Sequence, residues 1–457
     1  MHELLGLFRR HLVGIAHQLV RAVRARSRLL EPLETLGVIE ERRTLRMHAP
    51  QDEGGTSRKD AMNEDVVIIG AGQAAAQVAA SLRQGGFAGA ICMIGDEPYL
   101  PYQRPPLSKK FLSDGGTPES LALRAESFWR DHDVRLMLGA TVGEVDPRQC
   151  RLALRDGREI GYGTLVFATG TRARALPLPG IDLANVFSLR KIEDVRRLRP
   201  ALDNARRIAI VGGGYIGLEV AAAMRAEGRD VTVLETESRV MKRVTGAEVA
   251  AFFDRQHRGR GVDIRLGARL LAIEEKPGAL AVHASSAEAF AVDVVLIATG
   301  ARANDELAAA AGLACADGIL VDELTRASLP RVYAIGDCAR FPSRRYGRRL
   351  RLECVQNAID QAKAAAAAIR GEGEPYDPVP WFWSDQYDLK FQIAGIMDDH
   401  DSAELKGDPA SAQFSVEYRR GGRLIAVDAV NSARAYMMGR RRIGEETSAE
   451  PAERSPG

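Results

Sequence analysis

Two glycine-rich segments have the residue types and spacing that hold a phosphate. In the first, VVIIGAGQAA, Gly70 permits a tight turn, Gly72 lets the backbone approach a ligand, and Ala75 is small enough for close helix–strand packing. A helix that begins at such a turn directs its N-terminal amide groups and the positive end of its dipole at the phosphates. The second segment, IAIVGGGYIG, has glycine at all three positions: Gly212, Gly214 and Gly217. Each segment therefore predicts a dinucleotide-binding loop.

Each loop is followed by a strand that ends in a carboxylate. Asp96 and Glu97 close the strand after the first loop, and Glu235 closes the strand after the second. A carboxylate at this place accepts hydrogen bonds from ribose hydroxyls and repels a 2′-phosphate, so Glu235 favours NADH over NADPH. The strictness of this preference stays open, because three cations that follow could lie on the surface or contact the pyrophosphate: Arg239, Lys242 and Arg243.

The segments around both loops alternate between strand and helix patterns. An apolar run at 66–69 leads into the first loop, a helix is expected at 74–82, and a second strand at 90–94. The pattern restarts with a strand at 208–211, a helix to about residue 227 and a strand at 230–234. Two such copies predict an α/β protein with two doubly wound, Rossmann-like domains.

Composition excludes several classes of function. The chain has 457 residues and a net charge of +2, which gives no reason to expect a nucleic-acid partner. No stretch of 18 uninterrupted apolar residues exists, so we expect no membrane-spanning helix. Five cysteines form neither a CxxC pair nor a zinc-like cluster. We therefore expect reduced thiols in a cytoplasmic protein, and no metal site.

The two ends of the chain differ from the middle. In residues 1–61, apolar residues recur at helical spacing between arginines, which is typical of a basic amphipathic helix that binds a membrane or a partner. The alternative is that translation starts at Met62 and the preceding segment is a loose or non-native extension. We favour this alternative, because Met62 directly precedes the first core strand. Residues 444–457 are expected to form a disordered tail.

Beyond the loops, six blocks resemble one family. The sequence is similar to flavoproteins with two dinucleotide-binding domains, and among them to the NADH-dependent ferredoxin reductases of the putidaredoxin reductase, rhodocoxin reductase and aromatic-ring dioxygenase type. The likeness covers about residues 63–443. Its blocks are PYQRPPLSKKFL at 101–112, LVFATGTRAR at 165–174, VVLIATGARAND at 294–305, RVYAIGDCA at 331–339, ECVQNAIDQAKAAA at 353–366 and WFWSDQYDLKFQIAG at 381–395.

The resemblance implies a discontinuous FAD-binding domain. Two apolar strands end in Ala-Thr-Gly, at 168–170 and 298–300, and read as crossing points between domains. Two strands at 413–419 and 423–430, joined at Gly421-Gly422, predict a hairpin in a small C-terminal α+β domain. The expected order is an FAD domain at 62–170, an NAD domain at 171–297, the second part of the FAD domain at 298–375 and the C-terminal domain at 376–443.

The resemblance also implies which residues contact the cofactors. Asp337 follows a strand at 332–335 and matches the acid at the ribityl chain of FAD, the alternative being an ordinary turn aspartate. Trp383 lies beside the flavin or packs in a core. The full set expected for FAD is Gly70, Gly72, Ala74, Ala75, Asp96, Glu97, Arg104, Lys109, Val142, Arg174, Asp337, Val355 and Trp383. The set expected for NAD is Gly212, Gly214, Ile216, Gly217, Glu235, Arg243 and Gly300.

Two charged residues match the family's reactive centre. Lys109 matches a lysine beside the reactive flavin nitrogen, and Glu219 matches its carboxylate partner. A cation there stabilises an anionic reduced flavin, and the carboxylate orients the ammonium group. The alternatives are a solvated lysine next to Lys110 and a helix carboxylate paired with a surface cation. Neither residue is expected to be an acid–base catalyst.

The position of the cysteines indicates where the electrons go. No cysteine lies between Asp96 and Cys150, where disulfide and peroxide reductases of this fold place redox thiols. The expected acceptor is therefore a separate [2Fe–2S] ferredoxin that serves an oxygenase. It would bind transiently to a monomeric or homodimeric reductase. Other acceptors (rubredoxin, quinone or oxygen) and a redox-sensing role like that of apoptosis-inducing factor stay open. A basic run is either the docking site or a solvated loop: Arg344, Arg345, Arg348, Arg349, Arg351 and then Lys363.

Overall fold

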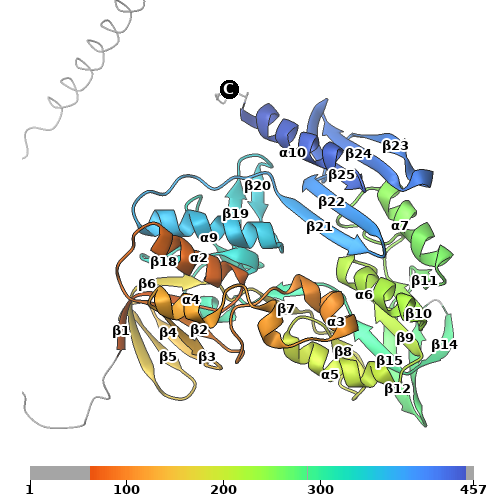
Figure 1. The fold of residues 1–457 in the computed structure, drawn as a ribbon, viewed down its shortest axis with the longest axis horizontal. Helices are drawn as coiled ribbons and strands as arrows, with labels where there is room; N and C mark the ends of the chain where they lie inside the picture. Colours follow the sequence, from red (N-terminus) through yellow and green to blue (C-terminus); the bar gives the residue numbers. More distant parts are fainter. Residues whose placement is uncertain (1–61, 286, 449–457) are drawn as a thin grey trace, which may run out of the picture. The chain divides into compact units, whose positions relative to one another are not determined.

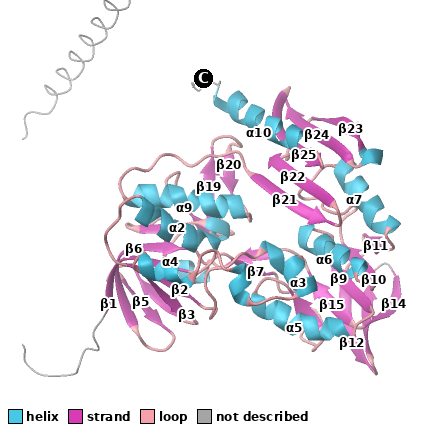
Figure 2. Ribbon diagram, viewed as in Figure 1, coloured by secondary structure: helices cyan, strands magenta, loops and turns pink. Residues whose placement is uncertain are grey.

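The computed structural model describes residues 62–285 and 287–448 (Figures 1 and 2). The helix and the extension expected in residues 1–61 lie outside the described residues, as does the expected C-terminal tail from residue 449 onward. Residues 444–448, expected to begin that tail, are instead the last turn of a C-terminal helix. Among the helices in the described ranges, none is long and apolar enough to cross a membrane.

The first sheet is built from two separate parts of the chain. Its strand order is β3-β2-β1-β6-β5-β4, and β18 pairs in parallel with β6. This pairing joins residues far apart in sequence and confirms the discontinuous arrangement. The first strand begins at Met62, earlier than its apolar run predicts, because it pairs with β6 from that residue onward. The strands are β1 (Met62–Ile69), β2 (Ile91–Gly95), β3 (Val134–Leu138), β4 (Val142–Asp146), β5 (Arg151–Leu154), β6 (Glu159–Phe167) and β18 (Val332–Ala334).

Alanine-rich helices cover one face of this sheet. Helices α2 (Gln73–Gln84) and α9 (Val355–Ile369) lie side by side in Figure 1 and share one hydrophobic core with β1. Their contact faces consist mostly of fully buried alanines, whose small side chains let the two helix backbones approach closely. The short helix α4 (Glu126–Asp131) adds the buried Trp129 to the same core.

The second sheet is parallel and lies in the middle of the sequence. Its order is β11-β10-β9-β15-β8. The strands are β8 (Val186–Ser188), β9 (Arg207–Val211), β10 (Asp230–Glu235), β11 (Asp263–Leu266) and β15 (Val294–Ile297). The helices around it are α5 (Ile192–Asp203), α6 (Tyr215–Ala226) and α7 (Ala247–Gly259). A three-stranded antiparallel sheet packs beside it, made of β12 (Leu270–Lys276), β13 (Ala279–Ala284) and β14 (Ala287–Val292).

The third sheet is antiparallel and forms the C-terminal part. Its order is β21-β22-β25-β24-β23, and helix α10 (Ala433–Ser448) packs against it. The predicted Gly-Gly hairpin is confirmed, because Gly421 and Gly422, both at positive φ, join β24 to β25. The strands are β21 (Trp381–Gln386), β22 (Leu389–Gly395), β23 (Ser402–Asp408), β24 (Gln413–Arg420) and β25 (Arg423–Val430).

Shorter elements connect these sheets. Strands β7 (Thr171–Ala173) and β16 (Ala301–Ala303) pair with each other directly after the two Ala-Thr-Gly sequences, where the chain leaves the first sheet and returns to it. The other short elements are η1 (Pro105–Ser108), α3 (Lys110–Asp114), η2 (Pro118–Leu121), α8 (Glu306–Ala310), β17 (Ile319–Leu320), η3 (Gly336–Cys338), β19 (Ala339–Ser343), β20 (Arg348–Leu350) and η4 (Pro409–Ser411).

The two glycine loops have the same backbone conformation and the same close contact at their first glycine. Gly70 and Gly212 have a φ of +114°, and a Cβ on either would lie 2.2 or 2.3 Å from the carbonyl oxygen of the Ala-Thr-Gly alanine opposite. Only glycine fits there. Gly72 and Gly214 face open space instead, since a Cβ on either would have no atom within 4 Å. The loops therefore pack tightly against the sheet on one side and leave room for a ligand on the other.

The third position distinguishes the two loops. Ala75 is fully buried and its Cβ is accommodated in the core. At Gly217 an added Cβ would lie 2.0 Å from the carbonyl oxygen of Gly212. A methyl group there would push α6 away from the loop.

The substitution Gly217→Ala should therefore weaken binding of the nicotinamide dinucleotide expected at this loop. A displacement of about 1 Å can cost up to about 100-fold, so we expect the KM for NADH to rise by at least about tenfold. The flavin content of the purified protein should not change, because the first loop is untouched. Steady-state kinetics and flavin absorbance measure both quantities, and an unchanged KM would contradict the steric argument.

A buried carboxylate joins the second and third sheets. Asp428 on β25 accepts hydrogen bonds from the hydroxyls of Thr245 and Tyr418, and the latter bond is 2.8 Å long. The Tyr418 oxygen in turn accepts a bond from the amide of Gly246. Burial raises the pKa of Asp428 to about 6, because the surroundings disfavour the charge.

This raised pKa predicts how stability depends on pH. A carboxyl whose pKa is higher in the folded than in the unfolded protein stabilises the fold below its ordinary pKa and loses that contribution as the pH rises through 6. Asp428→Asn keeps an acceptor for the hydroxyls and removes the charge. At each pH the melting temperature of the variant is compared with that of the unsubstituted protein. This difference should shift in favour of the variant by a few degrees when the pH is raised from 5 to 8. A difference that is equal at both pH values would show that the charge does not matter.

Candidate functional site

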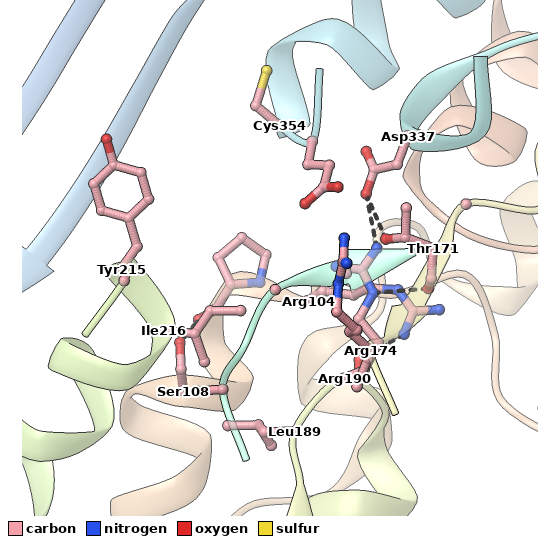
Figure 3. Close-up of a pocket in the computed structure, with 18 of the residues that line it drawn as sticks. Arg104, Ser108, Thr171, Arg174, Leu189, Arg190, Tyr215, Ile216, Asp337 and Cys354 are labelled. Atoms are coloured by element: carbon pink, nitrogen blue, oxygen red, sulfur yellow. Dashed lines mark hydrogen bonds and ion pairs between the residues drawn. The ribbon is translucent and has the colours of Figure 1, made fainter. Parts of the chain in front are cut away.

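One cavity of about 630 Å³ is lined by both glycine loops. Its wall includes Gly70 and Gly72 from the first loop, Gly212 and Gly214 from the second, and both Ala-Thr-Gly sequences. Figure 3 shows side chains of this wall, with Tyr215 and Ile216 on the side of α6 and Asp337 on the opposite side. Two ligands that occupy the two loops would therefore meet in the same space.

The predicted Lys109–Glu219 pair lies in the wall of this cavity. The ammonium nitrogen of Lys109 is 3.3 Å from Oε1 of Glu219 and 3.0 Å from Oδ2 of Asp385 on β21. The side chain of Lys109 is 22% exposed, so it is not the solvated lysine of the alternative interpretation. That of Glu219 is 7% exposed and its cation is Lys109, so it is not a helix carboxylate paired with a surface cation. The pair brings together the segment between η1 and α3, helix α6 and the C-terminal sheet.

Two serine hydroxyls complete the environment of Glu219. Ser108 donates to Oε2 over 2.6 Å and Ser384 donates to Oε1 over 2.7 Å. Burial raises the pKa of Glu219, while Lys109 and the two hydroxyls oppose this shift. A carboxylate in such a place needs these partners, because an isolated buried charge costs several kcal/mol.

The predicted FAD acid Asp337 lies in η3, at the carboxyl edge of the first sheet. Its Oδ2 accepts a hydrogen bond of 2.8 Å from Arg190 and one of 3.3 Å from Thr171, and these three side chains point toward one another in Figure 3. Arg190 comes from the loop before α5. The acid is therefore held by groups from the second domain rather than standing alone in a turn.

The two acids after the first loop have different surroundings. Glu97 is bonded to Arg104 over 2.8 Å and to the hydroxyl of Tyr102 over 2.7 Å. Asp96 is more exposed and pairs with Lys191 over 2.7 Å. Both acids and Arg104 line the cavity.

The acid after the second loop is fixed by backbone amides. Oε2 of Glu235 accepts from the amide of Gly213 over 2.7 Å, and Oε1 accepts from the amide of Glu237 over 2.9 Å. Lys242 pairs with Glu237 over 2.7 Å. Arg239 donates to backbone carbonyls of its own loop, so it serves the loop's shape, while Arg243 lines the cavity.

One further feature of the cavity fits a ligand at the second loop. Beyond the open space at Gly72 and Gly214, the hydroxyl of Thr299 in the second Ala-Thr-Gly is buried, has no partner and borders the cavity. The corresponding hydroxyl of Thr169 is satisfied by the carbonyl of Asn304 over 2.7 Å. An unpartnered buried hydroxyl is costly, so a polar ligand at the second loop would relieve it.

Most of the predicted site residues lie in the cavity wall. Three do not: Ala75 and Gly217 are buried behind the loops, in the packing positions that their small size predicts, and Val142 begins β4 and packs against the core of the first sheet. A cofactor contact at Val142 stays a prediction. The predicted residues that line the cavity are Gly70, Gly72, Ala74, Asp96, Glu97, Arg104, Lys109, Arg174, Asp337, Val355 and Trp383, with Gly212, Gly214, Ile216, Glu219, Glu235, Arg243 and Gly300.

Several residues at the site carry no sequence signal of their own. They occupy ordinary positions in their elements and become important through partners far away in the sequence. All of them except Arg190 lie within the family blocks, but the blocks do not single them out. The residues missed are Ser108, Thr171, Arg190, Thr299, Ser384 and Asp385.

The cations of the predicted basic run have partners, although several remain exposed. Arg344 pairs with Glu323 over 2.6 Å, and Arg348 pairs with Asp398. The other members also have partners. These are the Ile443 carbonyl for Arg345, the Val321 carbonyl for Arg349, Glu353 and Asp317 for Arg351, and Asp360 for Lys363. Of Arg344, Arg348 and Arg351, which pair with carboxylates, Arg344 is the most exposed, at 68%.

The cysteines form no disulfide, and the one in the cavity wall is a protonated thiol. All five are free, and Cys354 at the start of α9 lines the cavity. Burial raises its pKa to about 12, so the group is a protonated thiol and a poor nucleophile at neutral pH. Burial also raises the pKa of Cys338. Within the described ranges, no group of three or more His, Cys, Asp or Glu could hold a metal ion.

Comparison with known proteins agrees with this geometry. Residues 64–362 match the family described as pyridine nucleotide-disulphide oxidoreductase, and residues 381–455 match a reductase C-terminal domain. A ferredoxin–NAD(P)(+) reductase of a Sphingomonas species is 42% identical over 395 residues, 86% of this chain and 95% of that protein. The family confirms the predicted use of FAD and a nicotinamide dinucleotide.

Two solved structures share the fold. A ferredoxin reductase from Rhodopseudomonas palustris has a TM-score of 0.80 and 42% identity, and covers 82% of this chain and 93% of its own. The putidaredoxin reductase in a covalent complex with putidaredoxin has a TM-score of 0.80 and 38% identity, and covers 84% and 94%. The predicted fold class is confirmed, and the chain belongs to the pyridine nucleotide-disulphide oxidoreductase family.

Proposed function

We propose that this protein is an FAD-dependent NADH:ferredoxin reductase whose ferredoxin serves an oxygenase. The observation that carries this proposal is one cavity that both dinucleotide loops line, with Lys109 and Glu219 in its wall. The cysteine in that wall, Cys354, is a protonated thiol. The ferredoxin reductases among its relatives support the choice of acceptor.

The first loop, Asp337 and Trp383 would hold FAD. When bound, FAD accepts two electrons as hydride and can release them one at a time. The chain itself would supply a fixed positive charge, since Glu219 and Asp385 hold the ammonium group of Lys109 at the cavity wall. Such a charge needs no reorganisation when negative charge develops nearby.

The second loop would bind NADH, which exchanges during turnover. Glu235 is oriented by two backbone amides at the end of β10, where a ribose is expected. Glu237 adds a second carboxylate, and its pairing with Lys242 leaves that cation less able to bind a 2′-phosphate. We therefore propose a preference for NADH over NADPH.

The electrons would leave to a separate protein. None of the five cysteines forms a disulfide, and their scattered positions could not hold an iron–sulfur cluster. A transient complex with a [2Fe–2S] ferredoxin follows. Free cysteines also support the proposal of a cytoplasmic location.

The proposal is tested with purified protein, NADH and three acceptors. We expect one FAD per chain, reduction of ferricyanide by NADH, and reduction of cytochrome c that rises at least about tenfold when a [2Fe–2S] ferredoxin is added. NADPH should be a poorer donor. Preferential reduction of rubredoxin would favour that acceptor instead. A protein that NADH reduces but that turns over no acceptor would favour a redox-sensing role.

The exposed arginines at the β19–β20 turn predict how the ferredoxin docks. Although Arg344 and Arg348 are paired, they carry positive charge to the surface, and ferredoxins of this type are acidic. The double substitution R344E/R348E should raise the KM for ferredoxin about tenfold and leave ferricyanide reduction by NADH unchanged.

The matched control keeps the arginines and removes their partners. E323Q/D398N breaks the same ion pairs, so it reproduces any local disturbance without reversing the charge. Its KM for ferredoxin should stay equal or fall. If both double variants raise the KM equally, the effect is structural and the docking prediction is wrong.

A further inference from the structure

A chain of hydrogen bonds leads from Glu219 to His257 on helix α7 and on to Tyr387. Ser384 bonds to Glu219 over 2.7 Å and accepts a bond of 3.2 Å from the amide of Gln386. The other end of that amide is 2.9 Å from Nε2 of His257. Nδ1 of His257 is 3.1 Å from the hydroxyl of Tyr387. The chain thus connects α6, the C-terminal strand β21 and α7.

The proton positions along this chain follow from one another. The carboxylate of Glu219 only accepts, so Ser384 donates to it and the Ser384 oxygen accepts from the amide nitrogen of Gln386. The amide oxygen then faces His257, whose Nε2 must carry the proton. Nδ1 is left as the acceptor for Tyr387. Every bond is therefore donated in the same direction, toward Glu219.

The interior of the chain is shielded from water. Ser384, Gln386 and His257 are each 0% exposed. Burial lowers the pKa of His257 to about 4, so its ring is neutral at physiological pH and keeps the single proton that the chain requires. Arg260 lies 4.5 Å from the ring centre of Tyr387 and covers the outer end.

The amide of Gln386, in the middle of the chain, determines whether the chain can transfer protons. A relay of protons would require Gln386 to take a proton on its oxygen and release one from its nitrogen, which a neutral amide does only through an unfavourable tautomer. Serine and histidine on either side could relay a proton, but the amide interrupts them. What remains is a row of aligned dipoles whose positive ends point at one carboxylate.

We propose that Ser384, Gln386 and His257 are positioning residues that keep Glu219 ionised and aimed at Lys109. This inference rests on the proposed function, in which the Lys109 charge supports flavin reduction. The charged and titratable groups that face Glu219 are Lys109 and Tyr215, and Asp385 shares the same lysine. The donated bond from Ser384 lowers the pKa of Glu219 against the effect of burial.

The test uses a substitution that keeps the shape and reverses one bond. The ionised carboxylate that Gln386→Glu introduces cannot donate to Ser384, and it competes with Glu219 for the serine proton. The pKa of Glu219 should then rise, because it loses a donated bond. The rate of flavin reduction by NADH, measured in a single turnover, should fall at low pH as Glu219 is protonated. In the variant this fall should occur about one pH unit higher than in the unsubstituted holoenzyme. The KM for NADH should not change, and Gln386→Met should shift the pH of the fall in the same direction.

Tyr418→Phe is the matched control. It removes a buried hydroxyl from the same C-terminal sheet, at the contact with the loop before α7, but it does not belong to the chain. It should lower the melting temperature without moving the pH profile. If the Gln386 variants keep the unsubstituted profile, or if Tyr418→Phe moves it equally, the positioning role is wrong.

A second readout does not depend on turnover. With ¹⁵N-labelled histidine, the ring of His257 should be the neutral Nε2–H form from pH 8 to pH 5, and Gln386→Glu should raise its pKa. An Nδ1–H form, or a ring that titrates near 6.5, would overturn the assigned direction. This measurement holds even if the protein reduces no ferredoxin. Absence of any NADH-dependent flavin reduction would instead refute the proposed function.

Discussion

The structure depends on a buried carboxylate. This carboxylate needs hydrogen-bond donors from several parts of the chain, and so it constrains their relative positions. Glu219 sits at 7% side-chain exposure on α6, and its oxygens are satisfied by Ser108, Lys109 and Ser384. These donors come from the segment after the first loop and from the C-terminal sheet. Because an unpaired buried charge would cost several kcal/mol, the three parts must keep their relative positions for the charge to be tolerated. The same positions bring both dinucleotide loops to one cavity.

Local patterns predict the framework because the backbone imposes them. The turn at Gly70 requires a positive φ and the absence of a Cβ, and the same holds at Gly212, so the glycine spacing encodes the geometry directly. The Gly421-Gly422 hairpin is of the same kind. The discontinuous first sheet follows less directly. It rests on the resemblance, and only the pairing of β18 with β6 demonstrates it.

Long-range partners cannot be inferred in this way. Nothing about Ser384 or Arg190 in isolation indicates that one would bond to Glu219 and the other to Asp337, since each contact joins residues more than a hundred positions apart. The basic run illustrates the converse. Its sequence predicts a docking site or a solvated loop and gives no sign of the acids from other loops that pair with Arg344 and Arg348. A cluster of arginines in the sequence corresponds to unpaired positive charge in the structure only where no acidic residue from another segment pairs with it.

The asymmetry between the two loops bears on which ligand stays and which one leaves. On the first side, Asp337 and Glu97 are tied to arginines from other segments, and the hydroxyl of Thr169 is already bonded. These contacts make a preformed wall, which reduces the ordering cost of binding and favours a retained ligand. On the second side, the hydroxyl of Thr299 has no partner and Ile216 is 41% exposed. Glu235 is held by backbone amides on this side too, but the Thr299 hydroxyl is left for the ligand to satisfy, which fits a donor that binds and leaves.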